Sequence, residues 1–211
     1  MLSVNSFDEL NIIVGYSRSM PFDKYFDEME ISEKQKEQRK AIASQFEEML
    51  IFIAIYLFTM QQYGEVDWEA LQIEIESRYT QVARNAGITE RDAQYYAETF
   101  AQNYIDATQR HVDDLYYYSE DRARFNAENE ANFVGNTTDF EAAVTSGKKY
   151  KQWVDIQDSR ERKTHRKVGG TILPISEPFV VGNSQLQFPK DTSLGASADE
   201  IANCRCIARY F

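Results

Sequence analysis

The most apolar stretch of the chain is residues 49–58, MLIFIAIYLF. Its apolar side chains cover every side of a helix, and a helix of that kind is buried on every side. A helix needs about 20 apolar residues to cross a bilayer, so these 10 residues predict the central helix of a helical core. A surface for a partner chain or for a membrane is the alternative.

The residues around this stretch predict where its helix begins and ends. Ser32 and Gln35 form a capping-box pattern, in which the hydroxyl accepts a hydrogen bond from the Gln35 amide and the glutamine side chain reaches back. Gly64 follows Tyr63 and is typical of a helix end. We therefore expect one helix from Ser32 to about Tyr63.

Two further helices are predicted next along the chain. Asp67 can cap the first, whose stripe of apolar residues at spacings of three and four ends at Gly87. Thr89 begins a second capping pattern, and the helical stripe after it runs to about Tyr118. His111 lies on this stripe, and we interpret it as a core or boundary histidine. Three helices with short turns predict an antiparallel helical unit.

The composition changes near the C-terminal third of the chain. Residues 119–147 are polar, are rich in Asn and Glu and contain the breakers Gly135 and Asn136, which predicts a junction. Three of the four prolines and five of the nine glycines lie beyond residue 146. We therefore expect a helical N-terminal region, residues 1–145, and a separate C-terminal module, residues 146–211.

The C-terminal module is predicted to contain short strands and little helix, so the chain as a whole is expected to be α+β. The module has few aliphatic residues for its size, so we expect a metal or a neighbouring segment to help hold it. Its β-like runs are residues 150–156, 171–173, 179–181 and 186–188.

The charge of the chain is divided unevenly between these regions. The whole chain carries −11, which argues against a protein that wraps nucleic acid. Residues 146–211 hold 11 Lys and Arg against 7 Asp and Glu, a net charge of +4, so residues 1–145 carry −15. The two regions therefore suit different electrostatic partners, or each other.

The N-terminal sequence MLSVNSFDEL lacks the basic and long apolar segments of a secretory signal. With only 2 cysteines, the chain is not a disulfide scaffold. These features predict a soluble, cytosolic protein with reduced thiols and no association with a membrane.

Three residues of the C-terminal module are ligands that a soft metal prefers: His165, Cys204 and Cys206. Imidazole and thiolate both suit zinc, and Asp155 or Asp158 would supply a fourth ligand. The Cys-x-Cys spacing is tighter than the usual spacing of zinc sites. Buried structural thiols are therefore an alternative, and a strained disulfide is another.

A basic stretch surrounds the histidine. It favours contact with DNA phosphates or with an acidic protein surface, whereas a solvated face, or ion pairs with Asp155 and Asp158, would leave it without a ligand. Its cationic residues are Arg160, Arg162, Lys163, Arg166 and Lys167.

Common enzyme signatures are missing from the sequence. A zinc deaminase needs His-x-Glu and Cys-x-x-Cys, whereas the chain has His165-Arg166-Lys167 and a one-residue gap between its cysteines. There is no His-Glu-x-x-His motif, P-loop, Gly-x-Ser-x-Gly motif or dinucleotide fingerprint. We therefore do not expect an enzyme. A zinc-dependent hydrolase or nuclease using His165, Cys204 and Cys206 is the alternative, and an interaction module of a toxin or defence system is another.

The order of several residues over about positions 150–208 is distinctive. It resembles the phage Mu F-like minor head protein domain of the head morphogenesis proteins of tailed phages, in which a Trp, an Asp-x-Arg-x-Arg-x-x-His-like block, a Pro-rich middle and a final Asn-Cys-Arg-Cys follow one another. The residues that match are Trp153, Asp158, Arg160, Arg162, His165, Cys204, Arg205 and Cys206.

The resemblance implies a structural protein of the virion, present in few copies inside the head near the portal and in the host cytoplasm during assembly. Such a protein associates with the portal protein or the major capsid protein and assists head morphogenesis and genome packaging or delivery. The resemblance does not point to any cofactor, so the expectation of structural zinc rests on ligand chemistry alone. Contact with packaged DNA through the basic stretch is a further expectation.

Overall fold

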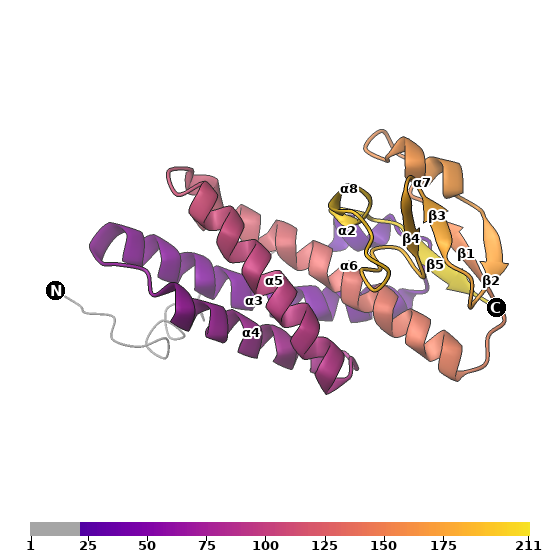
Figure 1. Ribbon diagram of the computed structural model, residues 1–211, viewed down its shortest axis with the longest axis horizontal. Helices are drawn as coiled ribbons and strands as arrows, with labels where there is room; N and C mark the ends of the chain where they lie inside the picture. The colour runs from indigo at the N-terminus through magenta and orange to yellow at the C-terminus, as the bar shows by residue number, and fades with distance from the viewer. Residues whose placement is uncertain (1–21) are drawn as a thin grey trace. The chain divides into compact units, whose positions relative to one another are not determined.

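The computed structural model describes residues 22–211 and is mainly helical, with short strands toward the C-terminus (Figure 1). The α+β fold class predicted from the sequence is confirmed. The prediction that no secretory signal is present falls on residues 1–21, which lie outside the described residues. The described chain forms two compact units: residues 41–128 make the first, and residues 22–40 with 129–211 make the second.

The first unit is built from helices. α4 and α5 pack against each other along their length, as the ribbon shows (Figure 1). The unit also includes residues 41–63 of α3 and residues 120–128 of α6. The helices are α3 (Glu33–Tyr63), α4 (Trp68–Asn85), α5 (Glu90–Arg110), the 3-10 helix η1 (Leu115–Tyr118) and α6 (Glu120–Thr145).

The apolar stretch 49–58 lies in α3 and is largely buried. Leu50, Ile53 and Leu57 are fully enclosed, whereas Phe58 is 45% exposed. The prediction of a central core helix is therefore confirmed. Among the described residues, α3 is also a helix long and apolar enough to cross a membrane, but 61% of its most apolar window is buried inside the protein. A core helix of a soluble protein has the same two properties.

The predicted helix caps are present. The Gln35 amide donates to Ser32 Oγ at 3.3 Å, and the Ser32 amide donates to Gln35 Oε1 at 3.1 Å. The Ala70 amide donates to Asp67 Oδ1 at 3.0 Å. The Asp92 amide donates to Thr89 Oγ1 at 3.2 Å. Local hydrogen bonds of this kind satisfy the amides that the first turn of a helix leaves free.

The interpretation of His111 as a core or boundary residue is wrong. α5 ends at Arg110, so the helical spacing does not continue to the histidine. His111 is exposed rather than part of the core, and its ring stacks on that of Tyr117 with centroids 4.3 Å apart. Its Nδ1 lies 2.8 Å from the Ala107 carbonyl oxygen, which identifies a local contact at the end of a helix.

The predicted breakers Gly135 and Asn136 do not interrupt the chain, because α6 continues through them as one helix of 26 residues. The boundary between the two compact units, after residue 128, nevertheless falls within the predicted junction at 119–147. The polar residues that suggested a loop include Asn132, Asn136 and Thr137, and the structure buries them. Gly135 lies inside this helix, where its lack of a side chain leaves room for that of Arg39, as described below.

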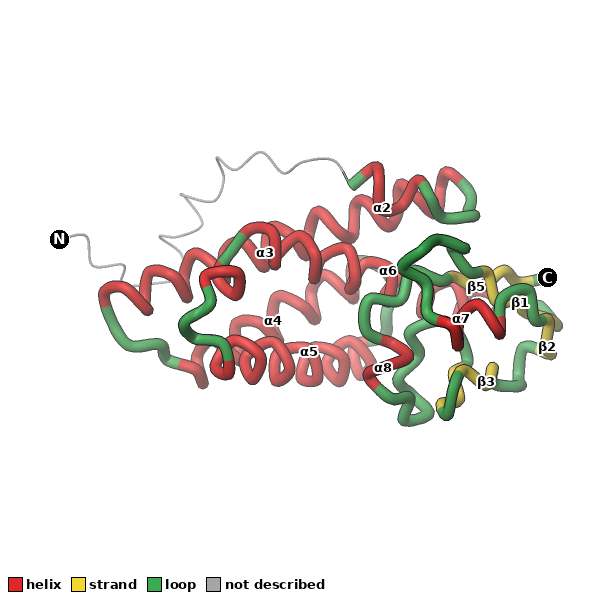
Figure 2. Tube along the Cα trace, turned by 90° about the horizontal axis from the view of Figure 1, so that it is seen from above, coloured by secondary structure: helices red, strands yellow, loops and turns green. Residues whose placement is uncertain are grey.

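The second unit contains two small antiparallel sheets, seen beside short helices in Figure 2. One sheet has the order β2-β1-β5, and the other pairs β3 with β4. Trp153 of β1 pairs with Ala208 of β5. The elements are α2 (Asp23–Asp27), β1 (Tyr150–Val154), α7 (Lys163–Val168), β2 (Ile172–Pro174), β3 (Phe179–Val181), β4 (Ser184–Leu186), α8 (Ala198–Ile201) and β5 (Ile207–Tyr210).

Three of the predicted β-like runs correspond to β1, β2 and β3, whereas β4 lies two residues before the run at 186–188 and β5 has no counterpart in the prediction. The second unit also takes in residues 22–40 and the end of α6, beyond the module predicted at 146–211. That the regions 1–145 and 146–211 act as separate domains stays a prediction.

Candidate metal centre

Three metal-ligating side chains meet inside the second unit. His165 lies on α7, and Cys204 and Cys206 lie just before β5. The Nδ1 atom of His165 is 3.6 Å from Cys204 Sγ and 3.4 Å from Cys206 Sγ. The donor atoms all lie within 4.8 Å of one another, and each residue is at most 3% exposed. The structure thus brings together the three residues that the sequence singled out.

The backbone before β5 turns both sulfur atoms toward the histidine. Asn203 has a positive φ of 55°, a conformation that asparagine tolerates better than most residues. The Cys204 amide donates to the Ile201 carbonyl oxygen at 3.3 Å. With one residue between them, the two cysteines then place their side chains on the same face of the chain. Both cysteines are free thiols, so the structure contains no disulfide between them.

A carboxylate lies behind the imidazole ring. Glu200 Oε2 is 3.2 Å from His165 Nε2, within ion-pair distance although the two atoms are not aligned as a hydrogen bond. Thr164 Oγ1 donates to the same oxygen at 2.7 Å. Gly182 makes room for this carboxylate, since a Cβ at that position would overlap Glu200 Oε1. Glu200 is therefore held beside the ring nitrogen that faces away from the sulfurs.

The charges of this cluster are coupled. Burial opposes ionisation of Cys204, but hydrogen bonds from Cys206 and His165 bring its pKa well below the ordinary value. The hydrogen bond that Cys206 gives to Cys204 and burial together raise the pKa of Cys206. Burial would lower the pKa of His165, but its contact with the Cys204 thiolate raises it. The protonation of each of these three groups thus depends on that of its neighbours.

Aromatic and aliphatic side chains enclose the cluster. The indole of Trp153 meets the His165 ring edge-on, with centroids 5.6 Å apart, and Trp153 is 0% exposed. The Phe179 ring also meets the indole edge-on, with centroids 5.3 Å apart. The two cysteines belong to the same buried core as these residues. A metal here would be shielded from bulk water.

The aspartates predicted as a fourth ligand lie elsewhere. Asp155 is not part of the cluster and instead lies near Glu161. Burial raises the pKa of Glu161, Arg166 opposes that shift, and the nearby Asp155 adds to it. Asp158 forms ion pairs with Arg160 and Arg205. Among the described residues, the cluster therefore offers three ionisable donors rather than four.

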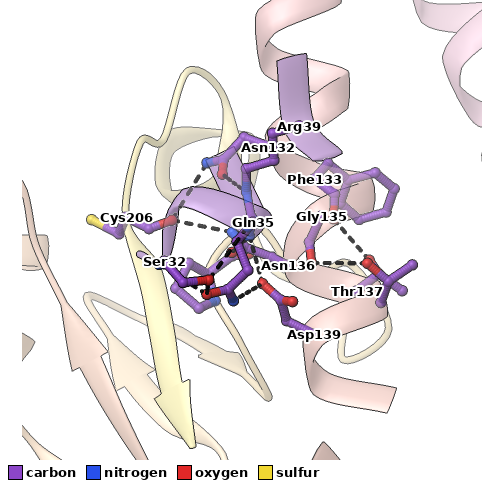
Figure 3. Close-up of polar contacts among 12 residues, drawn as sticks. Ser32, Gln35, Arg39, Asn132, Phe133, Gly135, Asn136, Thr137, Asp139 and Cys206 are labelled. Atoms are coloured by element: carbon purple, nitrogen blue, oxygen red, sulfur yellow. Dashed lines mark hydrogen bonds and ion pairs between the residues drawn. The ribbon is translucent and has the colours of Figure 1, made fainter. Parts of the chain in front are cut away.

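A buried polar network holds the cysteine segment from behind (Figure 3). Asn132 Nδ2 donates to the carbonyl oxygens of Cys204 and Cys206, at 3.2 and 3.4 Å. Asn136 Nδ2 donates to the carbonyl oxygens of Cys206 and Pro189, both at 3.1 Å. These asparagines are one helical turn apart on α6, so one face of the helix donates hydrogen bonds to the backbone at both cysteines.

Arg39 of α3 orders the same two amides. Its guanidinium donates to Asn132 Oδ1 at 3.4 Å and to Asn136 Oδ1 at 3.2 Å, which fixes each amide with its NH₂ group toward the cysteines. It also forms an ion pair with Asp139 at 2.8 Å and is 1% exposed. A Cβ at Gly135 would lie 2.7 Å from the Arg39 Cζ and Nε atoms, so this helical glycine is needed for the close approach.

Most of the basic stretch is engaged in contacts of the second unit. Arg205 bridges Asp158 and Glu28, and Arg160 pairs with Asp158 at 3.3 Å. Arg162 donates to the Ala202 carbonyl oxygen. The remaining arginine, Arg166, pairs with Glu161 at 3.1 Å.

Two cations of the stretch remain open to solvent. Lys163 and Lys167 are exposed, and within residues 22–211 neither forms an ion pair. The five cations predicted to contact nucleic acid are thus divided between the internal contacts of the arginines and two lysines that are available to a ligand.

Sequence reasoning missed the residues that support the cluster. Arg39, Asn132 and Asn136 lie far from the cysteines along the chain, and Glu200 looks like a solvated glutamate of a polar loop. One signal was present: Asn at positions 132 and 136 repeats at helical spacing, which would place two amides on one face of a helix.

Comparison with protein families gives one match: the model of the family described as Phage Mu protein F like protein aligns with residues 74–209 of the chain. The match begins within α4, so it includes most of the helical region as well as the C-terminal module. No curated protein and no solved structure matches the chain.

Proposed function

Since the chain belongs to the Phage Mu protein F like family, a family of phage head morphogenesis proteins, we propose that it is a structural minor head protein that docks on the portal or the major capsid protein. Proteins of this family are typically structural, act with other head components and are part of the virion. The finer role proposed here is an assembly function close to the portal, exercised first in the host cytoplasm and then inside the head.

The observation that carries the proposal is how the family-motif residues are used. Trp153, His165, Cys204 and Cys206 lie in the core of the second unit. Asp158, Arg160 and Arg205 are joined in ion pairs that extend to Glu28. Residues with these contacts build a framework, and this supports a structural role over an open catalytic site.

The first unit supplies the surface we assign to the protein partner. Residues 41–128 contain 16 Asp and Glu, 6 Arg and no Lys, a net charge of −10. Packaged DNA would repel such a surface, whereas a basic patch on a head protein would attract it. Several of its acidic side chains, such as Glu69 and Glu98, are exposed. We therefore expect docking to weaken as salt rises.

Co-expression of the full chain with the portal protein of the same phage tests the proposal. We expect the two proteins to co-sediment at moderate salt, with fewer copies of this chain than of portal subunits. The double variant Glu69→Gln and Glu98→Gln should weaken the complex several-fold, whereas Glu177→Gln in the second unit, which also removes exposed negative charge, should not. A folded chain that co-sediments with neither the portal protein nor the major capsid protein would overturn the docking proposal.

A zinc-dependent hydrolase is not favoured by the site. Its three donors are at most 3% exposed, and the acidic residue beside them, Glu200, contacts the histidine rather than an open cavity. A general base must reach a substrate-bound proton directly or through one water. Likewise, no observation in the described residues favours a toxin or defence module.

A further inference from the structure

The distances within the His165, Cys204 and Cys206 cluster match those of a tetrahedral metal site. Zinc bonds of about 2.3 Å to sulfur and about 2.0–2.1 Å to nitrogen, at tetrahedral angles, place sulfur and nitrogen about 3.5 Å apart. The observed separations of His165 Nδ1 from the two sulfurs are 3.6 and 3.4 Å. The ligand atoms thus need little movement to surround an ion.

A carboxylate lies close to the second nitrogen of the histidine, on the side where a metal-bound imidazole has its partner. A ligating histidine usually turns its other ring N–H toward a carboxylate, which fixes the tautomer and makes the ligand more basic. Glu200 Oε2 lies 3.2 Å from His165 Nε2, and Thr164 holds that carboxylate with a 2.7 Å hydrogen bond. Nδ1 therefore faces the sulfurs with its lone pair when Nε2 carries the proton.

The supporting shell is also built on the cysteine side. Asn132 and Asn136 bind the carbonyl oxygens of Cys204 and Cys206, and Arg39 orders both amides. Ligands fixed before the metal arrives bind it with a smaller loss of conformational entropy. Four residues outside the cluster, from α3, α6 and α8, thus fix the three donors.

The donor set selects the metal. Two thiolates and one imidazole are soft ligands that favour zinc over magnesium or calcium, which prefer oxygen. Two thiolates also balance the two positive charges of a divalent ion. Within the described residues three side chains supply donors at the cluster, so a tetrahedral ion would take its fourth donor from outside this set.

We propose that His165, Cys204 and Cys206 bind a zinc ion that ties α7 to the segment before β5, and that Glu200 orients the histidine. The role is structural. The second unit has few aliphatic residues and short strands, and a small unit of this kind gains folding free energy from a metal. The proposal is independent of portal binding, since the ion would be needed whichever surface the partner contacts.

Metal analysis of the full-length protein tests this proposal. We expect about one zinc per chain after purification and dialysis, and a lower melting temperature once a chelator removes it. Cobalt added to the zinc-free protein should give the absorption of a tetrahedral site with thiolate ligands, and Cys206→Ser should abolish the thiolate band.

The role of Glu200 has its own test, which keeps the proposal open to refutation if the cysteine variants fail to fold. Glu200→Gln should weaken zinc binding 10- to 100-fold, roughly the usual effect of losing such a carboxylate. The control Glu177→Gln, an exposed glutamate of the same unit, should bind zinc like the wild type. A folded, reduced wild-type chain that neither retains zinc nor takes up cobalt would overturn the proposal. So would zinc affinity that survives replacement of both cysteines.

Discussion

Lys151 shows how one buried charge affects the stability of the second unit. Its side chain is 0% exposed and donates to the backbone oxygen of Gln187 at 2.7 Å and to Gln187 Oε1 at 2.8 Å. Burial lowers the pKa of Lys151 from 10.5 to about 8, although Asp191 and Glu177 oppose the shift. The folded protein therefore holds this proton less tightly than the unfolded chain does.

We predict that the free energy of unfolding rises with pH between about 8 and about 10.5, the ordinary pKa of lysine, because the unfolded chain binds more protons there. Below pH 8 the lysine is protonated in both states and its contribution is constant. The rise due to Lys151 should be on the order of 3 kcal/mol. Urea unfolding of wild type and Lys151→Met across this range measures it. Equal slopes for the two proteins would show that Lys151 does not have the lowered pKa.

Gly135 is a second position where one atom matters. Alanine is favoured over glycine inside a helix by about 1 kcal/mol. A Cβ here would nevertheless push against a buried guanidinium, with its closest approach at 2.7 Å. We predict that Gly135→Ala destabilises the protein by about 1–3 kcal/mol, the usual effect of overpacking.

A double-mutant cycle separates the steric effect from helix propensity. In an Arg39→Ala background the added methyl group meets no guanidinium, so Gly135→Ala should become neutral or stabilising. Denaturant unfolding of the four proteins measures the coupling. An unchanged loss in the Arg39→Ala background would show that the glycine is needed for another reason.

At the scale of whole elements, α6 is held against the cysteine segment by its asparagines. Asn136 makes three hydrogen bonds: it donates to Pro189 and Cys206 and accepts from Arg39. Buried polar groups left without partners cost about 1–3 kcal/mol. We predict that Asn136→Ala lowers the free energy of unfolding by about that amount.

Asn126 provides a matched control on the same helix. It is half-buried and donates to the Arg122 carbonyl oxygen. Asn126→Ala should change stability by less than about 0.5 kcal/mol, as for most surface positions. If both variants lose the same amount in urea unfolding, the bonds of Asn136 to the cysteine segment carry no special weight.

The elements that the sequence predicts well are those specified by neighbouring residues. Ser32 with Gln35, and Asp67 with Ala70, act within three positions of each other, so their caps are visible in the sequence. The apolar stretch 49–58 is likewise buried because of its own composition. Structure that depends on such local patterns can be predicted because it needs no contact with distant residues.

The features that the sequence does not reveal depend on distant contacts. Arg39 meets Asn132 and Asn136 across 93 and 97 residues, and this contact turns an apparent loop into a buried helix. From the sequence alone, the polar residues of α6 are therefore typical of a loop, because their buried partner Arg39 lies far away along the chain. The three candidate metal ligands can be found in the sequence by chemical type, whereas Glu200 cannot, since nothing local distinguishes it from a solvated glutamate.

For the whole molecule, charge separates the two proposed contacts. The basic stretch retains Lys163 and Lys167 as exposed cations, while its arginines contact groups of the second unit. We therefore expect any contact with packaged DNA to depend mainly on these lysines. We predict that the full chain binds DNA weakly at about 50 mM salt, and that the double variant Lys163→Ala and Lys167→Ala reduces the slope of log affinity against log salt by about 2.

Filter binding or fluorescence anisotropy across a salt series measures this slope. Lys148→Ala with Lys149→Ala, two exposed lysines of the same unit outside the stretch, is the control and should leave the slope nearly unchanged. No DNA binding by the wild type at about 50 mM salt would rule out the DNA contact and leave portal or capsid docking unaffected.

The central claim, that this chain is a minor head protein, is tested most directly by quantitative mass spectrometry of purified heads of the phage that encodes it. We predict that the chain is present in these heads at a copy number far below that of the major capsid protein. Its amount should fall sharply in heads assembled without the portal protein. Abundant chain in the infected-cell lysate, together with its absence from purified heads, would contradict the claim.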